Sequence, residues 1–140
     1  MNIDSIENGI VIDHITAGKA MKLYELLNLG DIDAQVAIIK NATSHKMGKK
    51  DIIKIDADID VDIDAIGYVD PGATVSIIRD GKLAEKVKLD LPPRLINIIK
   101  CRNPRCITST EQELDHVFKL VESEHRIYRC VYCESKAKKL

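Results

Sequence analysis

The stretch CRNPRC, residues 101–106, carries two of the protein's four cysteines and decides how the C-terminal part of the chain folds. The other two follow after 23 residues in CVYC, residues 130–133, so all four lie within the last 40 residues. Four thiolates on two short loops make the closed tetrahedral shell that structural zinc sites use. We therefore expect one structural zinc ion per chain, with no open position for catalysis, bound by Cys101, Cys106, Cys130 and Cys133.

Two other chemistries compete for these cysteines. A disulfide framework suits small secreted chains, but the N-terminal residues MNIDSIENG have neither the basic start nor the apolar stretch of a signal peptide. A rubredoxin-like iron site is the second alternative, and the C-x4-C spacing of the first loop favours it less than zinc. We expect a cytoplasmic protein in which the thiols stay reduced.

Size explains why this segment uses a metal. From Asn97 to Leu140 the chain offers some 44 residues, close to the length below which an apolar core alone rarely holds a fold. We expect a small three-stranded, zinc-ribbon-like β domain that depends on its metal. Its apolar face is predicted to consist of Val117, Leu120, Val121, Ile127, Tyr128 and Val131.

Charge divides the chain into two domains. Residues 1–93 carry 11 basic and 16 acidic side chains, whereas residues 94–140 carry 10 basic and 6 acidic ones. The break falls at LDLPPRLIN, where two successive prolines remove backbone donors and favour extended geometry. The sequence predicts a first domain over 1–93, a second over 94–140, and a linker over Leu91–Leu95.

The first domain alternates strand and helix signals. GIVIDHIT follows the turn signal Asn8-Gly9, and the hairpin predicted near its end turns at Asp80-Gly81. The expected strands are 9–16, 34–42, 51–57 and the two arms of 73–89, and the expected helices are 17–30 and a short one ending near Gly67. This order predicts an α+β fold of the ferredoxin-like βαββαβ plan, with helices on one face of an antiparallel sheet.

Alternation along the first strand places its side chains on two faces. Ile10, Ile12 and His14 are predicted to share one face, with Val11, Asp13 and Ile15 on the other. Neighbouring residues that face opposite ways do not make an acid–base pair, so Asp13 and His14 do not predict catalysis.

Three further features have plain structural interpretations. DADIDVDID, residues 56–64, lacks the glycine and glutamate of a calcium loop and predicts a solvated acidic edge. HKMGKKD, residues 45–51, could bind phosphate, although lysine-rich turns are commonly only hydrated. His45, His116 and His125 are expected at the surface, because four cysteines already complete a zinc shell.

The sequence as a whole resembles a known family. Its motifs, in order, are VIDHI (11–15), MGKKDIIKID (47–56), YVDPGATVSII (68–78), LPPRLINII (91–99), the C-x4-C loop and CVYCE (130–134). They match the regulatory chain of aspartate carbamoyltransferase over essentially the whole chain. The resemblance implies a non-catalytic subunit of the pyrimidine pathway, whose N-terminal domain binds CTP and UTP as inhibitors and ATP as activator.

The resemblance also implies which residues act. Nucleotides are expected at Ile3, Asp4, Ser5, Ile6, Val11, Asp13, His14, Lys54, Ser76, Ile78 and Lys86. Lys86 and His14 suit phosphates, Asp13 and Lys54 suit ribose or base, and backbone groups near Asp4 to Ile6 suit a base edge. Ser76 replaces a family asparagine and Gly81 a family tyrosine, so specificity among the three nucleotides is left open.

Partners follow from the same resemblance. Asn103 and Glu134 match family contacts to the catalytic chain, and Arg105 stands where the family has a second asparagine. The implied assembly pairs two regulatory chains and joins them to catalytic chains in a hetero-oligomer.

Two other function classes are alternatives to a regulatory chain. A zinc-ribbon nucleic-acid-binding protein would use the same cysteines, but this chain has one Phe, four Tyr, no Trp and a net charge of −1, which disfavours nucleic acid. A small metalloenzyme would need an open metal position or an activated nucleophile. No run approaches the apolar length of a membrane span.

Overall fold

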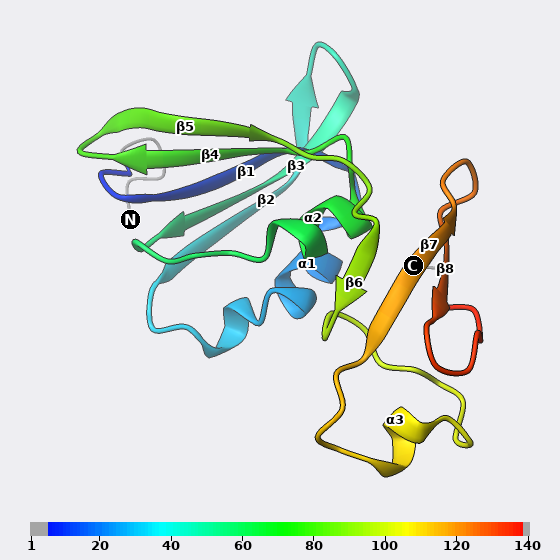
Figure 1. The fold of residues 1–140 in the computed structure, drawn as a ribbon. Helices are drawn as coiled ribbons and strands as arrows, with labels where there is room; N and C mark the ends of the chain where they lie inside the picture. The colour runs from blue at the N-terminus through cyan, green and yellow to red at the C-terminus, as the bar shows by residue number, and fades with distance from the viewer. Residues whose placement is uncertain (1–5, 139–140) are drawn as a thin grey trace. The chain divides into compact units, whose positions relative to one another are not determined.

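The computed structural model describes residues 6–138 and divides the chain into two compact units, Met1–Asp90 and Leu91–Leu140. Each unit has its own antiparallel sheet, one of five strands and one of three (Figure 1). The positions Ile3, Asp4 and Ser5 lie outside the described residues. In the part that is described, no helix has both the length and the apolar character needed to cross a membrane.

The N-terminal unit has the predicted ferredoxin-like fold. Its elements are β1 (Gly9–Thr16), α1 (Ala20–Leu26), η1 (Leu29–Asp31), β2 (Gln35–Ser44), β3 (Gly48–Asp56), α2 (Ile63–Val69), β4 (Thr74–Arg79) and β5 (Lys82–Lys88). The sheet order is β2-β3-β1-β4-β5, and every neighbouring pair is antiparallel. The first four strands and two helices follow the βαββαβ plan, which β5 extends at one edge.

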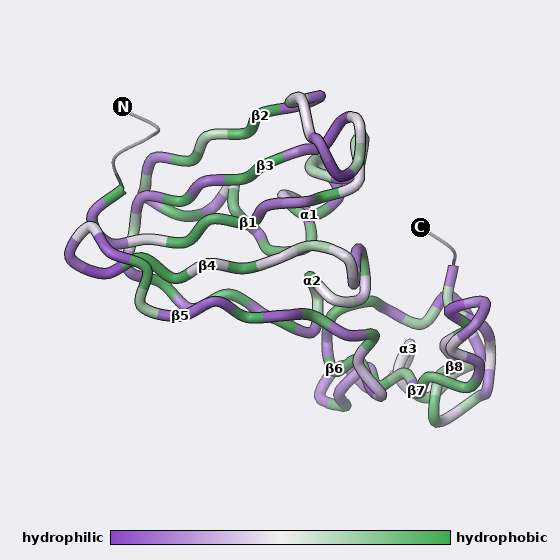
Figure 2. Tube along the Cα trace, turned by 90° about the horizontal axis from the view of Figure 1, so that it is seen from above, coloured by the Kyte–Doolittle hydropathy of each residue, from purple (hydrophilic) through white to green (hydrophobic). Residues whose placement is uncertain are grey.

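The core of this unit lies between the sheet and its helices. α1 and α2 both cover the same face of the sheet (Figure 1), where they contribute Ala20 and Leu23, and Ile66 and Val69, respectively. Paired strand residues complete the core, because side chains directly opposite one another share a face. Hydrophobic and hydrophilic stretches alternate along the strands in Figure 2, as a sheet buried on one face requires.

A bulge in β1 overturns the predicted strand faces. The register with β3 runs from Ile12 opposite Ile53 to Ile15 opposite Asp51, so Asp13 and His14 together face one residue of β3. His14 has a φ of 56°, and Ile15 is fully buried. Ile15 therefore joins the core face, whereas the prediction had placed it opposite Ile10 and Ile12.

A buried carboxylate holds a second bulge, in β2, and the connection between β1 and α1. The register between β2 and β3 shifts between Ile39 and Ala42, on the opposite side of Asp51. Asp51 is fully buried, and its carboxylate accepts hydrogen bonds from the backbone N–H groups of Gly18, Ala20 and Asn41 at 3.0, 3.3 and 3.0 Å. One side chain thus satisfies three donors that the regular ladders leave unpaired.

Two predicted elements of this unit have the wrong length. The helix expected over 17–30 begins only after Gly18, whose φ is +97°, and ends before Asn28, whose φ is 54°. These left-handed residues interrupt helical geometry at both ends. The loop expected between the second and third strands is mostly strand, because β2 and β3 continue to Ser44 and from Gly48.

The leading segment lies against the β4–β5 hairpin. Asp80 and Gly81 form its turn with φ of 53° and 74°, as predicted for a two-residue hairpin. The N–H of Gly81 donates to the carbonyl oxygen of Glu7 at 2.9 Å, and Ile6 is buried. Gly9 permits this packing, since a Cβ there would lie 2.2 Å from the carbonyl oxygen of Ile55.

The acidic stretch 56–64 alternates in exposure. All five aspartates, from Asp56 to Asp64, are exposed, while Ala57, Ile59, Val61 and Ile63 pack against the core. Asp62 also caps α2, because its carboxylate accepts the N–H of Ala65 at 3.2 Å. The stretch is a solvated edge, as predicted.

The C-terminal unit is a three-stranded sheet with one short helix. Its elements are β6 (Arg94–Ile96), α3 (Ile107–Thr110), β7 (Val117–Glu122) and β8 (Ile127–Cys130), with the sheet order β6-β7-β8. The linker predicted over Leu91–Leu95 is wrong, because Leu95 is a fully buried strand residue that pairs with Phe118. The two prolines precede this strand, where their missing N–H groups cost no ladder bond.

The buried face of this sheet differs from the predicted one. It is formed by Leu95, Phe118 and Tyr128, and the hydroxyl of Tyr128 donates to the carbonyl oxygen of Pro92 at 2.7 Å. Val121 and Val131 were predicted to be buried, but they are 50% and 40% exposed. Strand alternation puts them on the other face, since Phe118 sets which side of β7 is covered.

Candidate functional site

The four cysteines converge in the C-terminal unit. Their ligand atoms all lie within 4.8 Å of one another, and the close pairs join the two loops. The Sγ atoms of Cys101 and Cys133 are 3.5 Å apart, and those of Cys106 and Cys130 are 3.7 Å apart. Four sulfurs at about 2.3 Å from a tetrahedral ion stand about 3.8 Å from each other, so the cluster has the dimensions of a metal shell.

The thiols also have the chemistry of metal ligands. Burial and the neighbouring cysteines raise the pKa of Cys101 to about 12, and burial raises the pKa of Cys130. The hydroxyl and backbone N–H of Ser135 lower the pKa of Cys133 to about 6. Thiols whose pKa values differ so much do not all ionise at one pH without a metal, whereas a bound cation displaces the protons of all four. The cluster therefore fits a metal ion that all four residues would hold.

Turns around the cysteines fix the sulfur positions. In the first loop the carbonyl oxygen of Asn103 accepts the N–H of Cys106 at 3.0 Å and the hydroxyl of Ser109 at 2.7 Å. The side-chain oxygen of Asn103 accepts the N–H of Arg105 at 3.0 Å. In the second loop, Glu134 has a φ of 64° and donates its N–H to the carbonyl oxygen of Cys130 at 2.9 Å. Asn103 and Glu134 thus both shape the loops that carry the sulfurs.

Two outer residues support the cluster. The hydroxyl of Thr108 donates to the Sγ of Cys106 at 3.1 Å, and the backbone N–H of Cys101 donates to Nδ1 of His116 at 3.3 Å. His116 is half-buried, which differs from the surface position expected for it, while His45 and His125 are exposed as expected. Such groups orient metal ligands without touching the ion.

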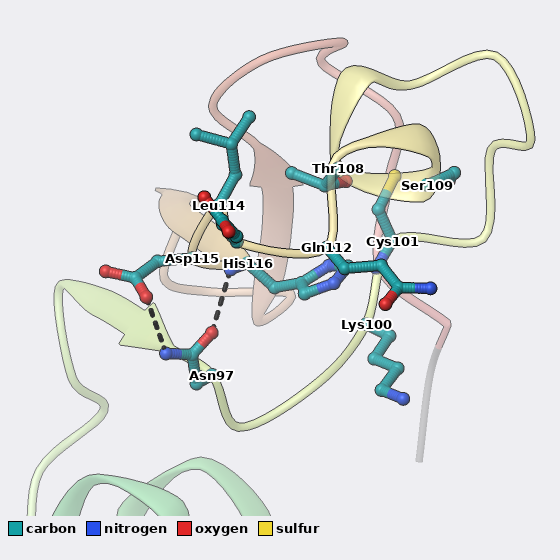
Figure 3. A pocket seen from close by; sticks show the side chains of 10 residues that line it. Asn97, Lys100, Cys101, Thr108, Ser109, Gln112, Leu114, Asp115 and His116 are labelled. Atoms are coloured by element: carbon teal, nitrogen blue, oxygen red, sulfur yellow. Dashed lines mark hydrogen bonds between the residues drawn. The ribbon is translucent and has the colours of Figure 1, made fainter.

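A polar cleft of about 640 Å³ opens beside Cys101 (Figure 3). Asn97 fixes two other residues that line the cleft. Its amide nitrogen donates to the carboxylate of Asp115 at 2.9 Å, and its amide oxygen accepts the N–H of His116 at 2.9 Å. Figure 3 shows the His116 ring next to Cys101. The cleft belongs to the scaffold of the cysteine cluster, because two residues that line it, His116 and Thr108, are hydrogen-bonded to Cys101 and Cys106.

The outer face of the five-stranded sheet gathers the second set of predicted site residues. Lys54 pairs with Val11, Val11 pairs with Ser76, and Ser76 pairs with Lys86. Directly opposite residues lie on one face, so these four positions form one row across β3, β1, β4 and β5. The two lysines stand at its ends, on the face that α1 and α2 leave uncovered.

Asp13 and His14 lie beside this row, on the bulge of β1. The carboxylate of Asp13 meets the ammonium of Lys50 at 2.9 Å, and Nδ1 of His14 lies 3.1 Å from the hydroxyl oxygen of Thr74. Partial burial raises the pKa of Asp13, but the hydrogen bond from Lys50 and the N–H of His14 outweigh it and leave the pKa below its usual value. The bulge thus fixes a carboxylate and an imidazole beside the row, with Lys50 as the lysine in contact with the carboxylate.

The remaining predicted residues lie at the hairpin end of the same sheet. Ile78 pairs with Gly9, and Ile6 lies next to Gly9 in the segment that contacts the β4–β5 turn. Ile6, Val11, Asp13, His14, Lys54, Ser76, Ile78 and Lys86 are therefore all on β1, its leading segment and the three strands around it.

Sequence reasoning missed Lys50, Thr74 and Thr108. Lys50 is two residues before Ile52 on β3, and period two would have placed it with Lys54 on the outer face. Thr74 faces Asp13 only through the sheet register. Thr108 follows Cys106 by two residues, and a hydroxyl so close to a ligand is a recognisable signal of sulfur support.

Comparison with known families agrees with this geometry. Residues 1–90 match the family described as "Aspartate carbamoyltransferase regulatory chain, allosteric domain". Residues 93–139 match "Aspartate carbamoyltransferase regulatory chain, metal binding domain". The two matches together span nearly the whole chain.

Individual relatives carry the same name. The chain is similar to an aspartate carbamoyltransferase regulatory chain of Clostridium acetobutylicum, with 50% identity over 134 residues, 96% of this chain and 92% of the relative. It is 48% identical to that of Clostridium botulinum over 134 residues, with the same 96% and 92% coverage. It is 45% identical to that of Bifidobacterium longum over 138 residues, 99% of both chains.

Proposed function

Because the chain belongs to the family of aspartate carbamoyltransferase regulatory chains, we propose that it binds CTP, UTP and ATP and passes their effect to catalytic chains. Family membership makes it a non-catalytic chain of pyrimidine biosynthesis with an allosteric and a metal-binding domain. CTP, with UTP assisting, inhibits and ATP activates. The nucleotide domain covers residues 1–93, and the domain that binds zinc and touches the catalytic chain covers 94–140.

The main support for the nucleotide site is the row of paired residues across the outer face of the five-stranded sheet. Lys54 and Lys86 flank Val11 and Ser76, and this arrangement puts two cations three strand spacings apart, about 14 Å, on a unit of net negative charge. Lys86 and His14 suit the phosphates, and Asp13 and Lys54 suit ribose or base. Val11 and Ile78 supply the apolar surface on which a base lies. Ile6 and, by the family resemblance, Ile3, Asp4 and Ser5 are proposed as further nucleotide contacts.

Opposite effects of CTP and ATP require that each nucleotide favours a different state of the assembly. A coupling of about 1–3 kcal/mol between the sites would change activity about 5-fold to 150-fold. Ser76 and Gly81 stand where larger base-contacting residues are expected from the family, so discrimination between pyrimidine and purine is proposed to depend on the space they leave and on backbone groups.

The metal centre is proposed to be zinc with a structural role. Cys101, Cys106, Cys130 and Cys133 would hold it, and the ion would supply rigidity and no chemistry to a substrate. Rigid loops then present Asn103 and Glu134 to the catalytic chain. The cytoplasm is the proposed compartment, because four thiolates persist there in the reduced state.

Pairing of two regulatory chains is proposed to use the β2 edge. β2 is the outermost strand of the five-stranded sheet and is 10 residues long, so it offers a row of backbone groups to a second copy. A groove of about 600 Å³ adjoins it, and the residues that line it include Met21, Tyr24, Leu29, Ile32, Val36 and Ile38. Edge pairing would cover both features at once.

Calorimetric titration of the zinc-loaded chain with CTP, followed by ATP in competition, tests the nucleotide proposal. We expect saturable heat from each nucleotide and mutual competition for one site. The same titrations on the assembled enzyme, followed by rate measurements, give the direction of each effect. A folded chain that gives no heat with either nucleotide would refute the effector role.

A further inference from the structure

The C-terminal sheet carries a row of four cations. Arg94 of β6 pairs with Lys119 of β7, Lys119 pairs with Arg129 of β8, and an isolated bridge joins Arg129 to Lys136. Residues directly opposite in antiparallel strands share a face, so the four form one line across the sheet. We call Arg94, Lys119, Arg129 and Lys136 the cationic row. It lies on the face opposite to Leu95, Phe118 and Cys130, which are buried.

The cationic row has no carboxylate partner among the described residues. Three members are exposed and Arg129 is half-buried. Within residues 6–138 no ion pair joins any member to a carboxylate; the guanidinium of Arg129 donates to the backbone carbonyl oxygen of Glu134 at 2.8 Å. Like charges directly opposite one another destabilise a sheet. A row that costs stability and has no internal counter-charge indicates an anionic partner.

Resting on the proposed function, we propose that the cationic row grips the catalytic chain and that the matching surface of that chain carries carboxylates. The row adjoins the metal centre through Cys130, which follows Arg129, and through Glu134, to which Arg129 is bonded. It therefore continues the surface already assigned to the partner. The new element is the chemistry of recognition, which is charge complementarity across a sheet face.

Exposed apolar side chains favour a protein over a nucleic acid as the occupant. Ile96 and Val131 follow row members by two residues, so they lie on the same face, and they are 55% and 40% exposed. Apolar side chains beside arginine are typical of protein interfaces. A surface for single-stranded nucleic acid would instead interleave cations with stacking aromatics.

Lys119→Glu tests this proposal, with Arg126→Glu as the matched control. Both residues are exposed and both substitutions change the charge equally, but Arg126 lies in the β7–β8 turn outside the row. The zinc-loaded chains are mixed with purified catalytic chain, and assembly is measured by sedimentation at low and high salt. We expect Lys119→Glu to weaken assembly about tenfold and Arg126→Glu to leave it nearly unchanged.

The stability of the isolated chain gives a second signature. Lys119→Glu puts a carboxylate between Arg94 and Arg129, so it should raise the melting temperature of the C-terminal unit while it weakens assembly. A residue with a merely structural role would not separate these two effects. Lys119→Gln provides a milder variant and should flatten the salt dependence of assembly.

Each outcome decides between the proposals. Equal assembly of wild type, Lys119→Glu and Arg126→Glu would overturn the cationic row and leave the regulatory function standing. Failure of the folded wild-type chain to assemble would overturn both. Binding of a DNA or RNA oligonucleotide that Lys119→Glu abolishes would assign the row to nucleic acid and refute the carboxylate partner.

Discussion

The two units of this chain solve the same problem of stability by different means. The N-terminal unit has a core cluster of thirteen buried hydrophobic residues contributed by the sheet and both helices. The described part of the C-terminal unit has five in its buried hydrophobic core, namely Leu95, Cys106, Phe118, Tyr128 and Cys130, and two of these are metal-ligand candidates. Apolar burial therefore suffices for the first unit, while the second requires the cross-links that four sulfurs and an ion would provide.

Metal removal should produce the largest difference between the units. Cys133→Ser, or a strong chelator, is expected to unfold the C-terminal unit and abolish assembly, because metal binding in such sites is worth about 10–16 kcal/mol of folding free energy. The N-terminal unit should stay folded and bind nucleotide. Zinc content, heteronuclear NMR of the two units and sedimentation with the catalytic chain measure the three effects.

Ser135→Ala is a suitable comparison for Cys133→Ser, because it removes a hydroxyl beside the same sulfur and keeps all four ligands. It should retain metal and assembly. A Cys133→Ser chain with full metal content and normal assembly would show that the cysteine cluster is not needed for the stability of the C-terminal unit. Loss of both units together would show that they do not fold independently.

The next largest effect is expected at Asp51, in the unit that needs no metal. Asp51→Ala leaves the N–H groups of Gly18, Ala20 and Asn41 without their acceptor, and it should lower the free energy of unfolding of this unit by about 3 kcal/mol. Chemical denaturation monitored on the N-terminal unit measures it. Asp56→Ala, an exposed change at the end of the same strand, should cost less than about 0.5 kcal/mol.

Asp51 also marks where reading the sequence succeeded and where it did not. Period-two alternation identified β1 and the β4–β5 hairpin, because each carries a strong local turn signal. The bulges of β1 and β2 carry no such signal. The β2 bulge depends on the Asp51 carboxylate, which also accepts backbone donors from the connection between β1 and α1. Asp51 alternates with Ile53 and Ile55 on the buried face, and this pattern was the available clue to its role.

The candidate sites show the same division. The cysteine spacing sufficed to predict the cluster, because two closely spaced cysteine pairs on short loops are the usual ligand pattern of a metal site. The row from Lys54 to Lys86 followed from the family resemblance, whereas its geometry required the register of four strands. His116 was misplaced because its hydrogen bond to Cys101 depends on how the segment before β7 returns to the first loop.

A smaller effect is expected when the nucleotide face is changed without touching either core. Lys86 is exposed, so Lys86→Ala should leave both units folded while it lowers CTP affinity about tenfold through the lost phosphate contact. Lys22→Ala, on the exposed side of α1, serves as the control and should bind like the wild type. Calorimetry on both variants decides, and equal CTP affinity would remove Lys86 from the site.

The smallest effect is expected in the titration of Asp13. Burial raises its pKa, but Lys50 and the N–H of His14 lower it below the usual 3.8, so the ion pair stabilises the N-terminal unit above that pH. This contribution is lost as the pH falls through the folded pKa. Lys50→Met removes the main opposing cation and leaves the burial, so the Asp13 pKa should rise. Carboxyl NMR on both chains measures this change, and an unchanged Asp13 midpoint in Lys50→Met would mean that the His14 backbone alone holds the carboxylate. In that case, Lys50 would be available to a nucleotide phosphate. The proposed site would then gain a cation whose charge Asp13 was expected to neutralise.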